Sequence, residues 1–334
     1  MGLATFVTGG TGFIGRKLVR SLNEQGETVH LLSRTSSDIT GLPEEGVEIF
    51  RGDVTDRPSL HAPTCGCDKV FHVAGYAHNW ARDPAVYYAV NVDGLKNVAE
   101  EALACGVGRL VFTSTCLTFG PSNGCVVDEQ TPRKTNVFLT EYERTKYLAE
   151  VEAAKFAQRG LCILTVNPTR VYGPGRMTEG NSVARMIDRY LRGRFPVIPG
   201  RGTEMGNYVY VDDLVDGHLK AMARGRAGEK YILGGENISF DGFFQLLGRL
   251  TGRRPPRFHL PPRLAKLFAR LEEWRAHVIG RYPLITPGWM ETFLGDWAFS
   301  SGKAVSELGY TYRELREGLE LTCNWLASGK PEPA

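Results

Sequence analysis

A glycine-rich turn close to the N-terminus constrains the fold more than any other stretch of the sequence. Residues 8–15 read TGGTGFIG and follow an apolar run, Leu3 to Val7, that predicts a buried strand. Apolar side chains of Phe13 to Glu24 fall on one helical face, so the turn joins a strand to a helix. Glycines in this context let the backbone approach a pyrophosphate, and the helix N-terminus offers unpaired N–H groups to the anion. The stretch predicts a dinucleotide-binding turn, against the alternative of a purely structural one.

Strands and helices alternate after this turn, which is typical of a parallel sheet with helices on both faces. Further runs with strand character lie at 28–32, 47–50, 70–74, 110–115, 161–166 and 230–233. Long helices are expected at 84–104 and 141–158. The sequence therefore predicts an α/β fold with a Rossmann-type, doubly wound parallel sheet.

The alternation stops after Gly175, where glycine, proline and arginine become frequent and helices are separated by loops. We expect residues 1–168 to form the dinucleotide-binding domain, with 206–235 returning to it. Residues 169–205 and 236–330 are then a smaller C-terminal substrate-binding lobe, which closes over the reactive end of the cofactor.

The end of the second strand bears on the choice of cofactor. A carboxylate there binds the ribose 2′-hydroxyl of NAD and repels a 2′-phosphate. This chain instead has Ser33 and Arg34, followed by further hydroxyl side chains at 35–37. A guanidinium at this position favours NADP, with NAD as the alternative if Arg34 is a solvated surface charge.

The third and fourth strands end in residues suited to a cofactor. In the stretch 52–56 (GDVTD), either Asp53 accepts a hydrogen bond from the adenine amino group or Asp56 caps the next helix. The fourth strand ends at Ala74 and Gly75, whose small size permits close approach. The aromatic loop 76–80 follows at the carboxyl end of that strand, where doubly wound sheets bind ligands.

Tyr142 and Lys146 form the second strong signal. Thr140 and Glu143 have the spacing of a capping box, so a helix starts here and places Tyr142 and Lys146 one turn apart on the same face. A neighbouring ammonium lowers the pKa of a phenol, which then exchanges a proton with an alcohol or carbonyl while hydride passes to or from nicotinamide. A chance pairing on an exposed helix is the alternative.

Two hydroxyls end the preceding strand. Ser114 and Thr115 are placed to hold a substrate oxygen beside the phenol, or they are ordinary strand-end residues with satisfied hydrogen bonds.

Composition excludes several classes of protein. A formal net charge of +3 is too small to argue for nucleic-acid binding. No apolar run approaches the ~20 residues of a membrane span, and no signal peptide is expected. The basic amphipathic segment Leu264 to Ile279 is expected to pack against its own domain and not on a membrane surface.

The seven cysteines show no paired spacing, which favours a reduced, cytoplasmic setting. His61, Cys65, Cys67 and His72 suggest a zinc site only superficially, because two of them lie in a short loop and His72 lies inside an apolar strand. We expect no metal.

Several ordered motifs together resemble the extended short-chain dehydrogenase/reductases, the NAD-dependent epimerase/dehydratase family. The motifs are 8–15 (TGGTGFIG), 52–56 (GDVTD), 113–115 (TST), Tyr142-x-x-x-Lys146, 167–175 (NPTRVYGPG) and 210–213 (YVDD). The resemblance covers nearly the whole chain. It implies a Rossmann fold with a small C-terminal substrate lobe, and a homodimer formed through the two long helices at 84–104 and 141–158.

The resemblance also implies roles for single residues. Tyr142 is the expected acid/base, Lys146 holds the nicotinamide ribose, and Thr115 orients the substrate where the family usually has serine. Ser114 takes that role if the register differs by one. The expected cofactor-binding residues are Gly9, Gly10, Thr11, Gly12, Phe13, Ile14, Gly15, Ser33, Arg34, Asp53, Val54, Ala74, Gly75, Asn91, Thr113, Tyr142, Lys146, Asn167, Pro168, Thr169 and Val171.

Within the family, the segment 206–218 looks more like the dihydroflavonol reductase and 3β-hydroxysteroid dehydrogenase branch. The arginine with which nucleotide-sugar epimerases grip a phosphate is absent at 206–208, which read GNY. Aromatic or apolar residues expected to line a substrate pocket are Tyr76, Trp80, Phe119, Phe138, Tyr172 and Met177.

The expected activity is interconversion of a carbonyl and a secondary alcohol on a hydrophobic small molecule, such as a sterol-, flavonoid- or polyketide-like compound. A nucleotide-sugar epimerase or dehydratase is the first alternative, and a non-catalytic dinucleotide-sensing protein is the second.

Overall fold

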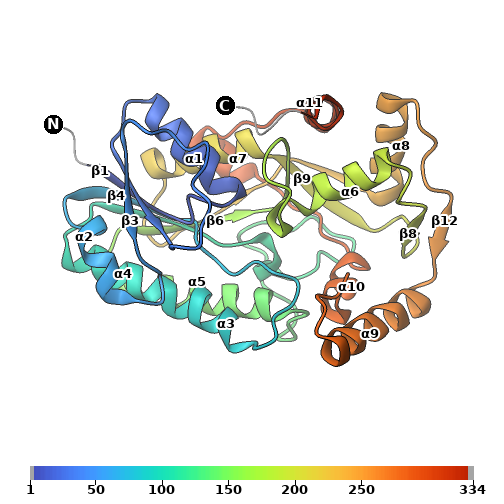
Figure 1. The fold of residues 1–334 in the computed structure, drawn as a ribbon, viewed down its shortest axis with the longest axis horizontal. Helices are drawn as coiled ribbons and strands as arrows, with labels where there is room; N and C mark the ends of the chain where they lie inside the picture. The colour runs from blue at the N-terminus through green and yellow to red at the C-terminus, as the bar shows by residue number, and fades with distance from the viewer. Residues whose placement is uncertain (1–3, 330–334) are drawn as a thin grey trace.

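A seven-stranded parallel sheet forms the centre of the structure, a computed structural model that describes residues 4–329 (Figure 1). Its strand order is β10-β6-β5-β4-β1-β2-β3. The strands are β1 (Ala4–Thr8), β2 (Val29–Ser33), β3 (Val47–Arg51), β4 (Cys67–His72), β5 (Arg109–Thr113), β6 (Ile163–Pro168) and β10 (Lys230–Leu233). Leu3, expected in the first strand, and residue 330 of the expected C-terminal lobe lie outside the described residues. The sheet confirms the predicted fold class.

Helices cover both faces of this sheet, and a hydrophobic core lies beneath each layer (Figure 1). One face carries α1 (Phe13–Glu24) and α7 (Val211–Arg224). The other face carries α4 (Gly94–Ala104) and α5 (Glu141–Gln158). The observed α1 and α5 have the bounds that their apolar spacing and capping box predict.

The long helix predicted at 84–104 is interrupted. It consists of α3 (Ala85–Tyr88), a π-helical turn η2 (Ala89–Asp93) and α4. Asn91 lies in the π turn, where its Oδ1 accepts a 2.7 Å hydrogen bond from the Tyr76 backbone N–H and its Nδ2 donates at 2.9 Å to Thr145 Oγ1. The turn therefore aims one polar side chain at both the loop after β4 and helix α5.

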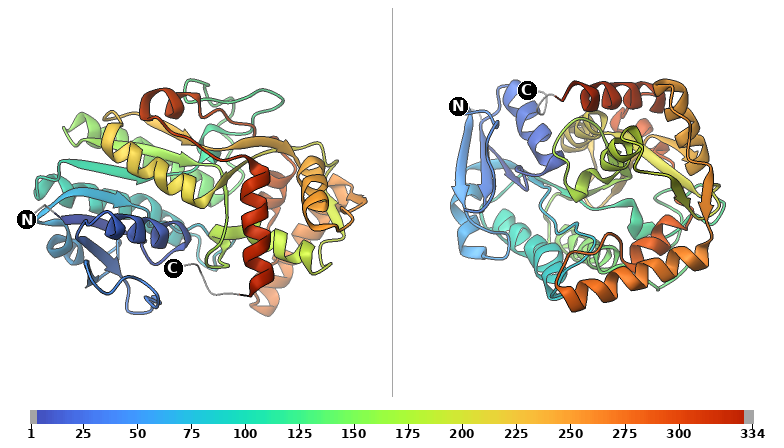
Figure 2. Two further views of the ribbon diagram at one scale, coloured as in Figure 1. Left: turned by 90° about the horizontal axis from the view of Figure 1, so that it is seen from above. Right: turned by 45° about the vertical axis from the view of Figure 1, so that its right-hand side comes forward.

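The remaining elements form the C-terminal part of the molecule and short connections (Figure 2). A three-stranded sheet contains β7 (Arg170–Tyr172), β9 (Met205–Tyr210) and β11 (Glu236–Ser239), and a two-stranded one contains β8 (Val197–Pro199) and β12 (Phe258–Leu260). The helices are α6 (Ser182–Leu191), α8 (Phe240–Thr251), α9 (Pro262–Ile279), α10 (Pro287–Phe293) and α11 (Leu315–Ser328). The short elements are η1 (Arg57–Leu60), α2 (His61–Thr64), η3 (Cys116–Phe119), η4 (Glu179–Asn181) and η5 (Ala304–Leu308). Of the segment 206–235, α7 and β10 return to the central layers, whereas β9 joins the small sheet.

Helix α9 differs from its expected packing. Its large apolar residues Leu267, Leu271 and Trp274 are exposed, and it faces the protein through Ala265 and Ala269. The expectation that its apolar residues pack on its own domain is therefore wrong. Within residues 4–329, we find no helix with the length and apolar character needed to cross a bilayer.

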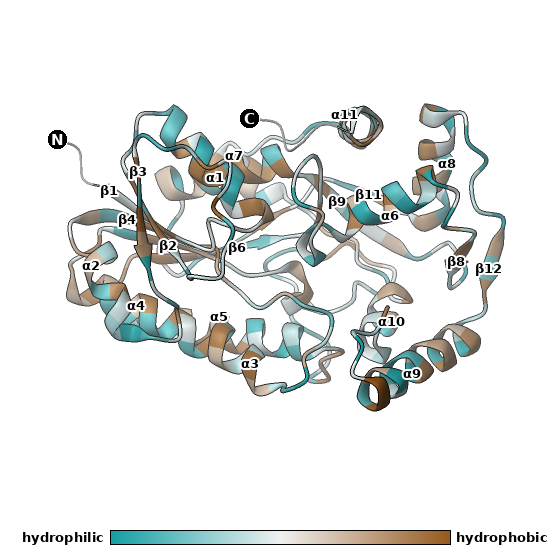
Figure 3. Ribbon diagram, viewed as in Figure 1, coloured by the Kyte–Doolittle hydropathy of each residue, from teal (hydrophilic) through white to brown (hydrophobic). Residues whose placement is uncertain are grey.

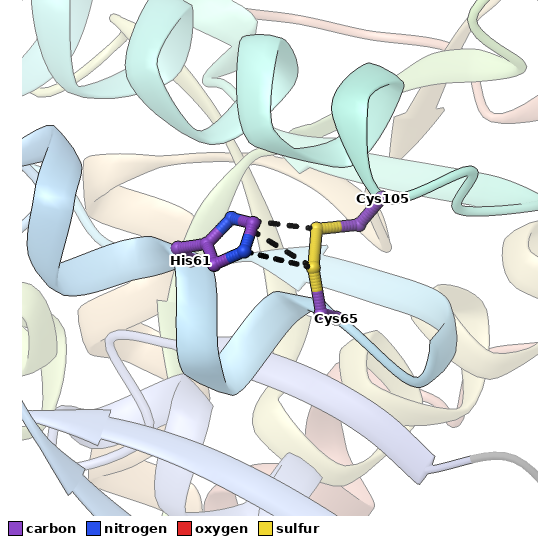
Figure 4. A group of neighbouring side chains, drawn as sticks. All are labelled: His61, Cys65 and Cys105. Carbon is purple, nitrogen blue, oxygen red and sulfur yellow. Dashed lines mark hydrogen bonds between the residues drawn. A yellow bond between two sulfur atoms is a disulfide. The ribbon is translucent and has the colours of Figure 1, made fainter.

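Cys65 and Cys105 form a disulfide that joins the end of α2 to the end of α4 (Figure 4). The expectation that the cysteines are unpaired is therefore wrong for these two, which lie 40 residues apart and meet only because α2 packs against α4. His61 lies against the two sulfurs. His72, which was considered together with His61 as a metal ligand, lies elsewhere: it is buried in β4, with its Nδ1 2.8 Å from Thr8 Oγ1.

Candidate active site

The glycine turn between β1 and α1 brings three stretches of backbone together. Gly9 has φ +73°, and a Cβ built there would lie 2.5 Å from the Ala74 nitrogen at the end of β4. A Cβ on Gly15 would lie 2.2 Å from the Gly9 carbonyl oxygen. Gly12 occupies the N-cap of α1 without supplying a side-chain cap. Only glycines fit this crowded turn, and the first N–H groups of α1 open toward the place where a pyrophosphate binds in such folds.

Two arginines, Arg34 and Arg51, lie at the end of β2. Ser33 is buried, and Arg34 is exposed immediately after it. Arg51 of β3 pairs with Ser33 of β2 and donates hydrogen bonds to Ser33 Oγ at 3.3 Å and to the Arg34 carbonyl at 3.1 Å. Sequence reasoning missed Arg51, because only the register of the two strands places it beside Arg34.

Asp53 closes a local turn after β3. Its Oδ1 accepts hydrogen bonds from Thr55 N at 2.9 Å and Thr55 Oγ1 at 2.8 Å. Asp56 precedes η1 but makes no side-chain cap, so that alternative is not realised. Val54 is buried against Gly94, which leaves it as part of the core.

A cavity of about 250 Å³ lies where the carboxyl ends of β4, β5 and β6 meet the C-terminal part of the chain. Predicted cofactor and catalytic residues supply much of its wall: Ile14, Gly75, Thr113, Ser114, Thr115, Tyr142, Lys146, Pro168, Thr169 and Val171. The structure thus gathers several separate sequence motifs at one place. This is the usual ligand position in a doubly wound sheet.

Tyr142 and Thr115 lie side by side on this wall. Burial raises the pKa of Tyr142 well above its usual value, although the side chain of Thr115 acts in the opposite direction and favours the phenolate. Thr115 Oγ1 also accepts a 3.3 Å hydrogen bond from Leu117 N. The hydroxyl of Thr115 therefore belongs to the same polar spot as the phenol.

Lys146 lies one turn along α5 from Tyr142 and is buried. Its Nζ donates a 2.7 Å hydrogen bond to the Thr113 carbonyl and lies 4.7 Å from the centroid of the Phe112 ring. Burial lowers the pKa of Lys146 to about 7, although the carboxylate of Glu150 opposes that shift. The predicted lowering of the Tyr142 pKa by this ammonium is not seen, because burial of the phenol outweighs other influences.

Glu150, one turn further along α5, is a buried carboxylate that sequence reasoning missed. Its Oε1 accepts hydrogen bonds from Ser114 Oγ at 2.5 Å, Thr118 Oγ1 at 2.8 Å and Asn167 Nδ2 at 2.7 Å. Its Oε2 pairs with Lys230 Nζ at 2.5 Å. The spacing Tyr142, Lys146, Glu150 puts all three on one helical face, and that spacing is the signal from which Glu150 could have been found.

The predicted substrate residues do not line the cavity. Phe119 and Tyr172 are buried in hydrophobic clusters, Phe138 packs on the guanidinium of Arg133, and exposed Met177 borders a separate shallow depression. These four residues lie outside the cavity wall, because an aromatic or apolar side chain packs equally well in a core. Tyr76 and Trp80 lie on the adjoining loop, where their rings contact Tyr87 and Tyr282.

Apolar residues of the C-terminal part of the chain line the cavity instead of the predicted substrate residues. The cavity is lined there by Val183, Met186, Tyr208, Phe240, Trp289 and Phe293. The Trp289 ring stacks on Tyr142, with centroids 6.2 Å apart and planes inclined by 23°. No local motif marks these residues, since only tertiary folding brings α6, α8 and α10 to the sheet.

Arg170 is a charged residue among these apolar ones, and Glu179 is another. Its guanidinium lies 5.1 Å from the Phe240 ring centroid and 5.7 Å from that of Phe293, and its Nη1 donates at 3.2 Å to the Tyr208 hydroxyl. A cation held by aromatic faces in a cavity wall is available to an electron-rich group of a ligand.

Comparison with known proteins agrees with this geometry. The sequence pattern of the NAD-dependent epimerase/dehydratase family matches residues 5–234. A Synechocystis sp. protein named provisionally as a dihydroflavonol 4-reductase is 34% identical over 325 residues, covering 96% of this chain and 93% of its own. Sterol demethylase protein B of Methylococcus capsulatus is 34% identical over 272 residues, covering 81% of each chain.

Solved structures share the fold over nearly the whole chain. The crystal structure of gox2253 superposes with a TM-score of 0.83 at 33% identity, covering 99% of this chain and 100% of that one. UDP-glucose 4-epimerase of Thermotoga maritima, crystallised with UDP-glucose, gives a TM-score of 0.80 at 26% identity, covering 98% and 99%.

Proposed function

Because the chain belongs to the NAD-dependent epimerase/dehydratase family, and is an NAD(P)-dependent oxidoreductase of the extended short-chain type, we propose that it interconverts a carbonyl and a secondary alcohol on a hydrophobic small molecule. The observation that carries this proposal is the make-up of the cavity. Its polar spot consists of Tyr142 and Thr115, and aromatic or aliphatic side chains from α6, α8 and α10 surround it.

The residues divide the chemistry between them. Tyr142 exchanges the proton of the alcohol oxygen, and Thr115 holds that oxygen beside the phenol. Hydride transfer is the chemistry that a bound nicotinamide supplies. Lys146 binds the ribose hydroxyls, and any positive charge that it retains there favours the phenolate of Tyr142. Ser114, whose hydroxyl is engaged by Glu150, positions the strand end and does not hold substrate.

We propose NADP as the preferred cofactor. The crowded glycine turn fits a dinucleotide pyrophosphate, because added Cβ atoms at Gly9 or Gly15 would overlap the backbone. Exposed Arg34, and Arg51 bonded to its backbone carbonyl, supply two cationic side chains at the end of β2 that suit a 2′-phosphate. The names of two relatives, for a flavonoid and for a sterol, support a hydrophobic substrate.

Arg170 favours a second candidate, a nucleotide-sugar epimerase or dehydratase. Its guanidinium borders the cavity and could contact a diphosphate, and a structural relative binds UDP-glucose. The positions 206–208 lack the arginine expected for that activity, and Asn207 is instead buried with its Nδ2 bonded to the Gly235 carbonyl at 2.9 Å.

A ligand panel separates the two functions. Melting temperatures are measured with NADH, NADPH, UDP-glucose, dTDP-glucose and a set of sterol- and flavonoid-like ketones, and each ketone is then assayed by NADPH oxidation. The proposal expects stabilisation by NADPH and turnover of a hydrophobic ketone. Stabilisation by a UDP-sugar, with cofactor that remains bound through purification and no ketone turnover, would establish the second candidate.

A further inference from the structure

Helix α9 presents its apolar side to solvent. We call the exposed apolar residues Leu264, Leu267, Phe268, Leu271, Trp274, Val278 and Ile279 the outer stripe of α9. They recur at three- and four-residue intervals, so they form one continuous face along the helix. Leu271 is 56% exposed and Trp274 is 65% exposed, values typical of surface lysines and not of core residues.

The opposite side of α9 explains this orientation. Ala265, Ala269 and Ala276 are buried, and the first two pack with Met290 of α10. Small residues let α9 lie close to α10, while the bulky residues have no room beneath the helix. The helix lies along the edge of the molecule, with apolar turns along its length (Figures 2 and 3). A contiguous apolar face on a protein surface marks an interaction site.

The charge around the outer stripe is positive. Residues 262–281 contain five lysines or arginines and two glutamates, and Arg275 pairs with Glu272 at 2.7 Å. Arg263, Lys266 and Arg270 lie along one edge of the stripe, and Arg281 follows the helix. Arg263, Arg270 and Arg281 are exposed, while Lys266 pairs with Glu291 at 2.7 Å.

We propose that α9 docks the protein on the surface of a lipid bilayer that carries anionic headgroups. An apolar face bordered by cations matches the two layers of such a surface: the outer stripe enters the acyl boundary and the arginines meet the phosphates. Trp274 in the middle of the stripe suits this boundary, because an indole combines a large apolar ring with one N–H. A second copy of the chain would bring two positive segments together, so charge argues against it as the occupant.

The docked helix is connected to the wall of the cavity through the segment that follows it. After α9, the Tyr282 hydroxyl accepts hydrogen bonds from the backbone N–H groups of Asn79 and Trp80 at 3.0 and 3.1 Å and donates to Glu179 at 2.8 Å. The chain then enters α10, whose Trp289 and Phe293 line the cavity. If the proposed function holds, this arrangement places the bilayer next to the path of a hydrophobic substrate.

Vesicle flotation without cofactor or substrate tests the docking alone, so its outcome is independent of the proposed reaction. We expect the wild-type protein to float with vesicles of phosphatidylcholine and phosphatidylglycerol, and less with phosphatidylcholine alone or at high salt. The variant Leu271→Glu/Trp274→Glu should lower the partition coefficient by about tenfold or more. Leu271→Phe/Trp274→Phe should float like the wild type.

The control places the same charges on exposed apolar residues elsewhere. Val305→Glu/Tyr312→Glu changes η5 and the segment after it, which pack near α7 and β10, and should float like the wild type. Failure of the wild type to bind anionic vesicles would overturn the proposal, as would equal losses in both glutamate variants. Sedimentation velocity showing a dimer that only Leu271→Glu/Trp274→Glu dissociates, without vesicle binding, would identify a second copy as the occupant instead.

Discussion

Ser114 Oγ donates a 2.5 Å hydrogen bond to Oε1 of Glu150, two helical turns along α5 from Tyr142. The two hydroxyls at the end of β5 therefore differ in their surroundings: Ser114 is hydrogen-bonded to α5, whereas Thr115 lines the cavity together with Tyr142. Sequence reasoning named Thr115 as the residue that orients the substrate and kept Ser114 as the alternative, and these contacts favour Thr115.

Replacing Glu150 by glutamine should destabilise the protein by about 2–3 kcal/mol, because its buried Oε atoms accept from four donors and an amide can satisfy only part of them. Urea unfolding measures the loss. The control is Glu152→Gln on the same helix, where Glu152 forms a surface ion pair with Lys155. This variant should change stability by less than about 0.5 kcal/mol. Equal losses in the two variants would contradict the role given to Glu150.

The buried ammonium of Lys146 should make stability depend on pH. Its pKa is about 7 in the folded protein, whereas an unfolded chain restores the ordinary lysine pKa of 10.5, so the unfolded chain binds more protons between these values. The free energy of unfolding should therefore rise with pH from about 7 to 10 by up to about 1.4 kcal/mol per unit, relative to Lys146→Met. Denaturant titrations of both proteins, without cofactor, measure this difference. Parallel pH profiles would show that Lys146 is not desolvated.

Tyr142→Phe should lower kcat by about 100- to 10,000-fold while the Kd for NADPH changes little, because only the proton-transferring hydroxyl is removed. Thr115→Val should also lower kcat, whereas Thr115→Ser, which keeps the hydroxyl, should retain most of it. Single-turnover assays and cofactor titrations give the two quantities. Full activity of Tyr142→Phe would exclude the proposed mechanism, and full cellular function of an inactive variant would favour a dinucleotide sensor.

Arg34→Ala and Arg51→Ala should each weaken NADPH binding by about tenfold, equivalent to one lost phosphate contact of about 1.4 kcal/mol, and leave NADH binding nearly unchanged. Fluorescence titration of both cofactors checks this. Arg20→Ala, on α1, provides a matched loss of one guanidinium away from the end of β2. If the wild-type protein prefers NADH, the assignment of NADP fails whatever the variants do.

The Cys65–Cys105 disulfide should stabilise the protein by about 4 kcal/mol, because it closes a loop over a sequence separation of 40 residues. Cys65→Ser/Cys105→Ser should lower Tm, and Cys125→Ser, which removes an exposed free thiol, should not. Thiol titration of the unreduced, unfolded protein should find five free thiols. Titration of all the cysteines as free thiols would show that the bond does not form where the protein is made; a cytoplasmic setting, in which disulfides are rare, stays a prediction.

The sequence predicted correctly the elements whose structure depends on short-range interactions, such as apolar spacing and helix capping. The glycine turn, the bounds of α1 and the start of α5 follow from spacing and capping, and the strand order follows once these units pack. Arg51 and Trp289 escaped prediction because their positions depend on strand register and on how α10 packs, which no short window of sequence contains. The proposed homodimer through the helices at 84–104 and 141–158 stays a prediction.

Helix α9 shows the limit of periodicity most clearly. Its pattern gives a correct helix and a correct apolar face, but the pattern does not say whether that face turns inward. The buried alanines determine the orientation of the helix, because only the side with small side chains fits closely against α10.

The π-helical turn at Ala89–Asp93 widens the helix by one residue at the point where Asn91 leaves it. Removing one residue from this turn would let the helix close as a regular α-helix with α4 almost unrotated, because a π turn accommodates one extra residue. The core contacts of α4 would then survive, whereas Asn91 would lose its alignment with Tyr76 and Thr145. A single-residue deletion here should therefore affect the placement of Asn91 more than the packing of α4.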